Sequence, residues 1–95
     1  MYIIIYNMLQ FTTVKDVKIN IGQWCKLLRK EHNLSRKQLA EQLALSALTI
    51  SKLENGHNPT LETLLKILQH FEQLDSFNVW IQTKTTEINT NSSLY

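Results

Sequence analysis

Residues that cross-link a chain or interrupt its regular structure are scarce in this sequence. Its 95 residues include one cysteine, one proline and two glycines. The single Cys25 allows no disulfide within the chain, so a reducing compartment is the default expectation. Gly22 and Gly56 lie far apart, which excludes a glycine-rich loop of the kind that holds phosphate groups.

Groups that could hold a metal or perform catalysis are scarce too. The three histidines are dispersed and have no cysteine or carboxylate at the spacing of metal ligands: His32, His57 and His70. No potential nucleophile stands in a sequence context that would activate it. We therefore expect a protein that is not an enzyme and that binds no metal or cofactor.

The sequence also lacks a long apolar run. Residues 1–9 are apolar, but they have no basic flank like that of a secretion signal and are far too short to span a bilayer. This predicts a cytoplasmic protein.

The net charge is only +2, but residues 1–58 carry eight Lys or Arg against four Asp or Glu, whereas residues 59–95 carry two against four. A nucleic-acid contact is therefore expected in the first half.

The composition is that of one small globular domain, and its organising stretch lies in the middle. Two short helices are predicted there, at Arg36–Leu43 and at Ala47 to about Asn55. Each follows a serine that is a good N-cap, Ser35 and Ser46, and Gly56 supplies the stop. Five apolar side chains of this pair are expected on one shared inner surface: Leu39, Leu43, Leu45, Ile50 and Leu53.

A helix is expected on each side of this pair. The first runs from residue 19 or 20 to residue 31, and apolar residues at helical spacing give it one buried stripe: Ile21, Trp24, Cys25 and Leu28. Asn33 takes the place of a left-handed cap. The last helix follows the N-cap Thr60 and ends near residue 72 or 73, with the same spacing at Leu61, Leu64, Leu65, Leu68 and Phe71.

These residues resemble the Cro/C1-type helix-turn-helix family, and within it the small domains of phage-repressor and antitoxin type. The resemblance covers roughly residues 21–71. It departs from the family at the turn, where Ala44 replaces the usual glycine, at a strain on the order of 1 kcal/mol if the left-handed conformation is kept. The matching positions are Leu28-Arg29, Leu34-Ser35, Leu39-Ala40, Thr49-Ile50-Ser51-Lys52-Leu53-Glu54-Asn55-Gly56 and Pro59-Thr60-Leu61.

The resemblance implies an all-α fold, a lambda-repressor-like bundle of four to five helices. It also implies that the helix beginning at Ala47 enters the major groove of DNA. By resemblance, base reading falls to Ser46, Ala47, Leu48, Ser51 and Lys52. Arg29 and Glu54 match a pair that forms an internal salt bridge in the family, so we expect neither to contact DNA.

Phosphate contacts are expected beside this helix. Thr49 and Asn55 stand at positions where the family contacts the DNA backbone. Arg36 adds a charge to the N-terminus of a helix, where anions are favoured, and Lys37 and His57 are further candidates. Affinity that does not depend on DNA sequence should then fall steeply with salt concentration.

The two ends of the chain are less regular. In the N-terminal extension, residues 1–18, the β-branched and aromatic residues 2–6 favour a short strand, or Met8 is the true start. After the DNA-binding domain, residues 19–73, apolar and polar residues alternate, which predicts a β-strand over residues 76–84. The composition of residues 85–95 predicts a flexible tail.

A lone strand is not stable, so this one is expected to pair with its counterpart in a second copy of the chain. The strand near the N-terminus is a competing partner. Trp80 either packs within the dimer or anchors a protein partner. This ending narrows the resemblance to HipB-type antitoxins, the partners of HipA-type kinase toxins. The residues assigned to the dimer strand are Phe77, Val79, Trp80 and Ile81.

The sequence thus predicts a transcriptional repressor that binds, as a homodimer, an inverted-repeat operator in double-stranded DNA. The half-sites would lie roughly 34 Å apart. The narrower prediction is the antitoxin of a HipBA-like toxin-antitoxin system, which represses its own operon and binds the toxin. A free-standing phage-type repressor or a restriction-modification controller is the alternative within this class. A protein-interaction module without DNA binding is the alternative from another class.

Overall fold

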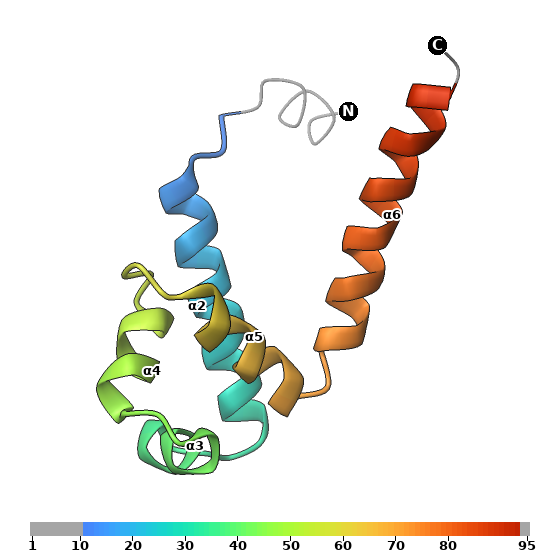
Figure 1. Ribbon diagram of the computed structural model, residues 1–95. Coiled ribbons are helices and arrows are strands. Elements are labelled where there is room, and N and C mark those ends of the chain that lie inside the picture. The colour runs from blue at the N-terminus through green and yellow to red at the C-terminus, as the bar shows by residue number, and fades with distance from the viewer. Residues whose placement is uncertain (1–10, 94–95) are drawn as a thin grey trace. The chain divides into compact units, whose positions relative to one another are not determined.

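The computed structural model describes residues 11–93, and this part of the chain is all-α, as predicted (Figure 1). The helices α2, α3 and α4 belong to one compact unit and α5 and α6 to another, with the division after Pro59. None of these helices is long and apolar enough to cross a membrane. The bounds are Val14–Glu31 for α2, Arg36–Leu43 for α3, Ala47–Glu54 for α4, Leu61–His70 for α5 and Leu74–Ser93 for α6.

Helix α2 begins at Val14 rather than at residue 19 or 20, because a capping box precedes it. Thr13 Oγ1 accepts a hydrogen bond from the backbone N–H of Asp16 at 3.0 Å, and Asp16 Oδ2 accepts one from the backbone N–H of Thr13 at 3.1 Å. Two N–H groups that a helix start leaves unbonded are thereby satisfied. Residues 14–18, expected in the extension, are therefore helical, while the strand expected at residues 2–6 lies outside the described residues.

Helices α3 and α4 lie where the sequence predicts them, and α4 ends at Glu54, one residue before the predicted end. Serine caps fix both starts. Ser35 Oγ accepts from the backbone N–H of Gln38, and Ser46 Oγ accepts from that of Thr49, each at 3.0 Å. The local sequence thus sets the start of both helices without help from distant residues.

The turn between α3 and α4 keeps the geometry expected of glycine although it contains alanine. Ala44 has φ 55° and ψ 41°, in the left-handed region. The backbone N–H of Leu45 donates to the carbonyl oxygen of Ala40 at 2.8 Å and closes the turn. Asn33 after α2 and Gly56 after α4 are also left-handed, with φ of 57° and 75°. All three positions were expected to end or redirect a helix.

The first unit has a small apolar core, to which α2, α3 and α4 all contribute. Burial raises the pKa of the Cys25 thiol to about 12, with a smaller contribution from the Glu54 carboxylate, so Cys25 acts as a small apolar side chain. Trp24 is 38% exposed, so the stripe expected on α2 is not buried along its whole length. The buried apolar residues of this unit are Cys25, Leu28, Leu39, Ala40, Ile50 and Leu53; Ile21, Leu43 and Leu45 are half-buried.

Helices α2 and α4 approach each other closely at Gly22. A Cβ atom placed there would lie 2.5 Å from the carbonyl oxygen of Leu53 and 2.6 Å from that of Glu54. Both contacts involve backbone atoms, which cannot turn aside as a flexible side chain could. Gly22 is therefore the residue that allows the last turn of α4 to lie directly against α2.

An ionic cluster, Arg29, Arg36 and Glu54, joins α2, α3 and α4; Arg29 and Glu54 are buried and Arg36 is half-buried. Glu54 Oε2 accepts from Arg29 Nε at 2.6 Å, and Glu54 Oε1 accepts from Arg29 Nη2 and Arg36 Nε, each at 3.0 Å. Arg29 Nη1 donates to the carbonyl oxygen of Leu34 at 2.8 Å. Burial alone would raise the pKa of Glu54, but the hydrogen bonds and charges of the two guanidinium groups hold that pKa below its usual value.

In the second unit, the row predicted for α5 is buried only in part: Leu64, Leu68 and Phe71 are buried, Leu65 is half-buried and Leu61 is 68% exposed. Thr60 Oγ1 caps the helix by accepting from the backbone N–H of Thr63 at 3.1 Å. A tight turn with left-handed Glu72 (φ 59°) leads into α6, closed by a 2.7 Å hydrogen bond from the N–H of Gln73 to the carbonyl oxygen of Leu68. The buried residues of this unit are Thr63, Leu64, Ile67, Leu68 and Phe71.

The β-strand predicted for residues 76–84 is wrong: these residues lie within the continuous helix α6 (Figure 1). Residues 85–93, predicted as a flexible tail, form the last turns of the same helix. A helix bonds its backbone groups internally, whereas a single strand leaves them without partners. Thr83 and Thr85, residues that favour strands, donate their hydroxyl protons to the carbonyl oxygens of Val79 and Ile81 at 2.8 and 3.0 Å.

The residues assigned to the dimer strand are accordingly helical and do not form a strand edge. Phe77 is half-buried, and the ring of Trp80 stacks on it with centroids 6.4 Å apart. Lys84 Nζ lies 5.6 Å from the centroid of the Trp80 ring. Val79, Trp80 and Ile81 remain 58%, 58% and 43% exposed. These residues therefore offer a second copy no strand edge to pair with. They lie on a largely exposed part of α6, where Phe77 and Trp80 stack on each other.

Replacing Gly22 by alanine should destabilise the first unit. Overpacking against backbone atoms costs about 1–3 kcal/mol, and it should outweigh the gain of about 1 kcal/mol in helix propensity. Urea unfolding followed by circular dichroism should give a lower midpoint than in the parent protein. Gln23→Ala changes the exposed neighbouring residue and serves as the control. A Gly22→Ala protein as stable as this control would contradict the close approach.

The ionic cluster should make stability depend on pH in the acid range. Because folding lowers the pKa of Glu54, its contribution is present above the unfolded value, near 4.5, and is lost as the pH falls through the lower folded value. Glu54→Gln leaves Arg29 buried without its counter-ion, at a cost of about 3–5 kcal/mol at neutral pH.

Denaturant unfolding at a series of pH values measures both effects. The Glu54→Gln protein should be less stable than the parent at neutral pH and should lose less stability on acidification. Glu41→Gln, an exposed change on α3, should leave the parent profile unchanged. Equal stability of the parent and Glu54→Gln at neutral pH would show that the cluster does not hold the helices.

Candidate nucleic-acid interface

The outer face of α4 carries the residues that the resemblance assigns to base reading. Ala47, Leu48 and Lys52 are exposed, and Ser51 is half-buried. Leu48 lies three positions before Ser51 and four before Lys52, so the three side chains share one side of the helix. The opposite side carries the buried Ile50, Leu53 and Glu54. The exposed side is thus free to meet a partner while the buried side holds the helix in place.

Hydrogen bonds within α4 already occupy part of its polar groups. Ser46 Oγ, besides capping the helix, lies 2.8 Å from Thr49 Oγ1 in a hydroxyl–hydroxyl hydrogen bond. Ser51 Oγ accepts from Asn55 Nδ2 at 3.4 Å and keeps its own proton for donation. Among the described residues, Lys52 has no ion pair, so its ammonium group is the charged donor of this face.

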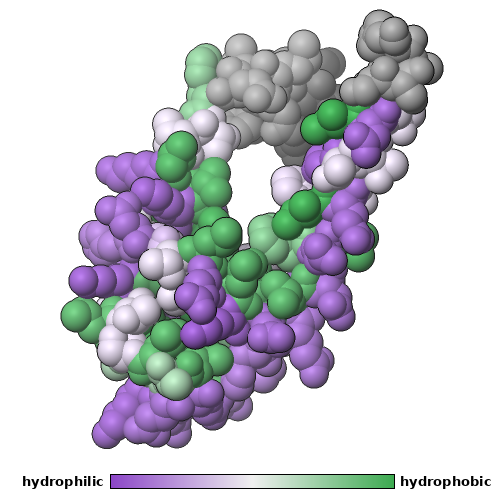
Figure 2. Space-filling view, viewed as in Figure 1, coloured by the Kyte–Doolittle hydropathy of each residue, from purple (hydrophilic) through white to green (hydrophobic). Residues whose placement is uncertain are grey.

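The cations expected to contact phosphate lie at the start of α3. Lys37 is exposed, and the side chain of Arg36 is 39% exposed although its Nε is bonded to Glu54. Both follow the N-cap Ser35, where the first backbone N–H groups of the helix point outward and favour an anion. Figure 2 shows hydrophilic residues gathered over α3, at the bottom of the view.

The other phosphate candidates lie in the first turn of α4, at Thr49, and just after its last turn, at Asn55 and His57. Asn55 and His57 are exposed, whereas Thr49 is half-buried. Lys18, which no sequence argument singled out, donates from α2 to Asn58 Oδ1 at 2.7 Å and so brings a cation beside this loop. The Thr13-x-x-Asp16 capping box was the signal that could have placed Lys18 on a helix.

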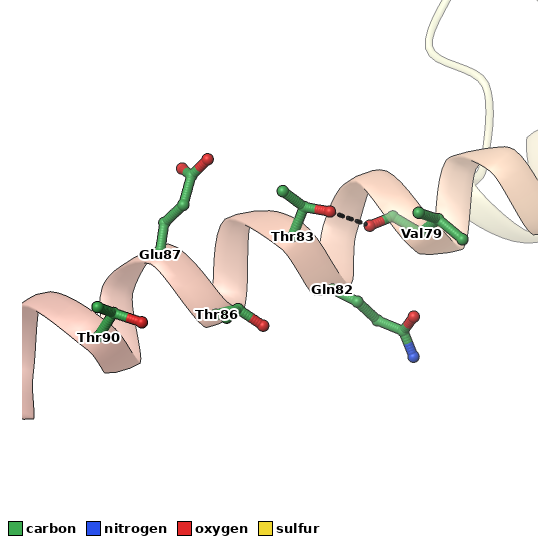
Figure 3. Close-up of a pocket in the computed structure, with 6 residues that line it drawn as sticks. All are labelled: Val79, Gln82, Thr83, Thr86, Glu87 and Thr90. Atoms are coloured by element: carbon green, nitrogen blue, oxygen red, sulfur yellow. Dashed lines mark hydrogen bonds between the residues drawn. The ribbon is translucent and has the colours of Figure 1, made fainter.

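Elsewhere on residues 11–93, the structure groups no side chains as a metal site would. The residues that line a hollow on α6 all belong to this one helix. Figure 3 shows Gln82 and Glu87 extending from opposite sides of the helix. Glu87 also pairs with Lys84 at 3.5 Å. In the described part of the chain, no three His, Cys, Asp or Glu side chains are grouped so that they could hold a metal ion.

The comparison with protein families agrees with this geometry. The helix-turn-helix family matches residues 26–75, which include α3, the turn, α4 and α5. No curated protein and no solved structure matches the chain. The match extends over more than half of the 95 residues and belongs to a family of DNA-binding domains rather than of enzymes. The chain is therefore a member of the helix-turn-helix family, in its Cro/C1-type form, and a DNA-binding regulator.

Proposed function

We propose that the chain represses transcription by inserting the N-terminal half of α4 into the major groove of an operator. The observation that carries the proposal is the exposed side of α4, which is held from behind by the ionic cluster and the apolar core. Lys52 would donate to guanine O6 or N7, and Ser51 would donate to an acceptor on a neighbouring base. Ser46 and Ala47 would lie at the same base edges.

Positioning on the DNA backbone would come from the residues around α4. Lys37 and Arg36 at the start of α3 would meet one phosphate, together with the N–H groups of that helix. Thr49, Asn55 and His57 are the further candidates. Because Arg36 is also bonded to Glu54, its contact would tie the phosphate to the ionic cluster.

A single recognition helix reads only a few base pairs, so we expect two copies on an inverted repeat. The side of α6 that carries Ile81 is our candidate for joining them. Its residues recur at the three- and four-residue spacing of paired helices, with one lysine, Lys84, in the same row. Much of α6 consists of Thr, Asn and Ser, which are poor helix formers, so packing against a second helix would stabilise it. The apolar row is Leu74, Phe77, Ile81 and Ile88.

The antitoxin role is a narrower hypothesis within the same class. The sequence supported this role only through a predicted C-terminal strand followed by a flexible tail. Because residues 74–93 form the helix α6 instead, that support is lost. The exposed Trp80 is the side chain that a HipA-like kinase toxin would contact if this role holds. A free-standing repressor or a restriction-modification controller needs no such partner. A pure protein-interaction module would use the same helices without DNA.

Two single substitutions should separate base reading from phosphate binding. Lys52→Ala should weaken binding to the operator about tenfold to a hundredfold and relax the preference for that sequence, because it removes a donor to a base. Lys37→Ala should weaken binding to all duplexes alike and lower the slope of log K against log salt by about 1. Fluorescence anisotropy with an operator selected by the parent protein from random duplexes measures both.

Lys66→Ala on α5 is the matched control, since Lys66 pairs with Glu62 in the second unit. It should bind DNA as the parent does. The parent protein's failure to bind any duplex at low salt would reject the DNA-binding repressor and favour the protein-interaction module.

The dimer can be tested through α6 alone. Ile81→Asp should turn the dimer into a monomer, because a carboxylate in an apolar contact between helices is unfavourable. Sedimentation velocity on the free protein measures the change. Thr86→Asp places the same charge on another side of α6, in the hollow of Figure 3, and should leave the dimer intact. A dimeric Ile81→Asp protein, or a monomeric parent, would exclude this side of α6 as the interface.

A further inference from the structure

The side of α4 proposed to face the bases has an apolar centre. Leu48 is 62% exposed, and the exposed Ala47 precedes it. A single exposed leucine is ordinary on a protein surface. At this position, however, the side chain lies on the side of α4 that is proposed to enter the groove.

The polar groups in the first turn of α4 are partly engaged within the helix. The hydroxyl groups of Ser46 and Thr49 bond to each other, and Ser46 also caps the helix. Only one of the two hydroxyl protons is left for a partner, since one hydroxyl donates to the other. One turn further, Ser51 and Lys52 are the donors that remain. The first turn of α4 thus offers a base edge an apolar contact beside a single hydroxyl proton.

We propose that Leu48 reads the C5-methyl group of a pyrimidine in the major groove, an inference that rests on the proposed DNA binding. The C5-methyl group is the apolar feature of the major-groove edges, and apolar side chains are the ones that contact it. Thymine carries this group, and 5-methylcytosine presents it at the same ring position. Cytosine and uracil lack it. Leu48 is then a specificity-determining residue that discriminates through a methyl group rather than through a donor or acceptor.

The effect of one methyl group can be stated in advance. Removing one buried methyl group should weaken binding about fourfold, from the usual free energy of burying one carbon. An operator with two symmetric half-sites would lose about fifteenfold when both methyl groups are removed. The change of about fourfold for one methyl group is smaller than the loss of about tenfold to hundredfold expected for Lys52→Ala, so single replacements distinguish the two contacts.

The test uses the full chain and the operator that the parent protein selects from random duplexes. Each thymine is replaced in turn by uracil, which removes the methyl group and keeps the pairing with adenine. Binding is measured at one salt concentration for the parent, for Leu48→Ala and for Leu61→Ala. Leu61 is also exposed, at 68%, but lies on α5 in the second unit, so its variant is the matched control.

In each half-site, one thymine should be sensitive to this replacement. A single uracil there should weaken binding by the parent and by Leu61→Ala about fourfold, and it should not change binding by Leu48→Ala. Replacing that pair by 5-methylcytosine–guanine and by cytosine–guanine separates the two sources of the methyl group. Tighter binding with the methylated cytosine assigns the contact to the methyl group in either base. Equal binding assigns it to thymine alone.

Other results would overturn the inference. If the parent binds the operator and no uracil weakens it, Leu48 reads no methyl group, while the proposed function stands. If a uracil weakens Leu48→Ala as much as the parent, another residue reads the methyl group. If the parent binds no duplex at low salt, the proposed function itself fails. We expect Leu48→Ala to fold as the parent does, because the Leu48 side chain is exposed. Circular dichroism on this variant checks its folding.

Discussion

One buried carboxylate sets the arrangement of the first unit. Glu54 accepts hydrogen bonds from arginines on two other helices, and its side chain is 1% exposed. A charge in this position is tolerated only while its partners stay in place, since the cost of burying it alone is several kcal/mol. Arg29 from α2 and Arg36 from α3 must therefore both reach the last turn of α4. The contribution of such a cluster lies more in fixing geometry than in added stability.

The same turn of α4 is held by two further contacts. Gly22 lets the backbone of α2 lie against the carbonyl groups of residues 53 and 54, and Leu53 is 1% exposed in the core. Charge, backbone packing and apolar burial thus all act at the C-terminal end of the helix. The N-terminal end depends on its serine cap, which uses only neighbouring residues. The C-terminal end of α4 is therefore fixed by contacts with other helices, whereas its N-terminal end carries the exposed residues.

Local signals in the sequence were enough to place α3, α4 and α5, because a serine or threonine cap marks each start and apolar residues recur at helical spacing. The pairing of Arg29 with Glu54 came from the family resemblance. The start of α2 was missed because residues 12–18 show no apolar period, so the Thr13 capping box was the only indication of a helix. The second partner of Glu54 was missed as well, because packing of α3 against α4 decides which cation reaches it.

Helix α6 was misassigned for a different physical reason. Phe77, Val79 and Ile81 alternate over a few residues, and a run this short fits a period of two as well as the spacing of a helix. The longer row that continues from Phe77 and Ile81 to Ile88 decides for a helix. Burial could not help, because residues 78–90 are exposed throughout. Hydroxyl groups that bond back to the helix carbonyls make the threonine-rich sequence compatible with this state.

The division of α4 into a held end and a presented side also affects how such a protein can diversify. Ala47, Leu48 and Lys52 contribute nothing to the core, the ionic cluster or the cap. Exchanging them should therefore alter target choice at little expense in folding, whereas Ser46 and Thr49 are constrained by the cap that they form. After gene duplication, copies of this chain could acquire new operator sequences by substitutions at these three surface positions and keep the same fold.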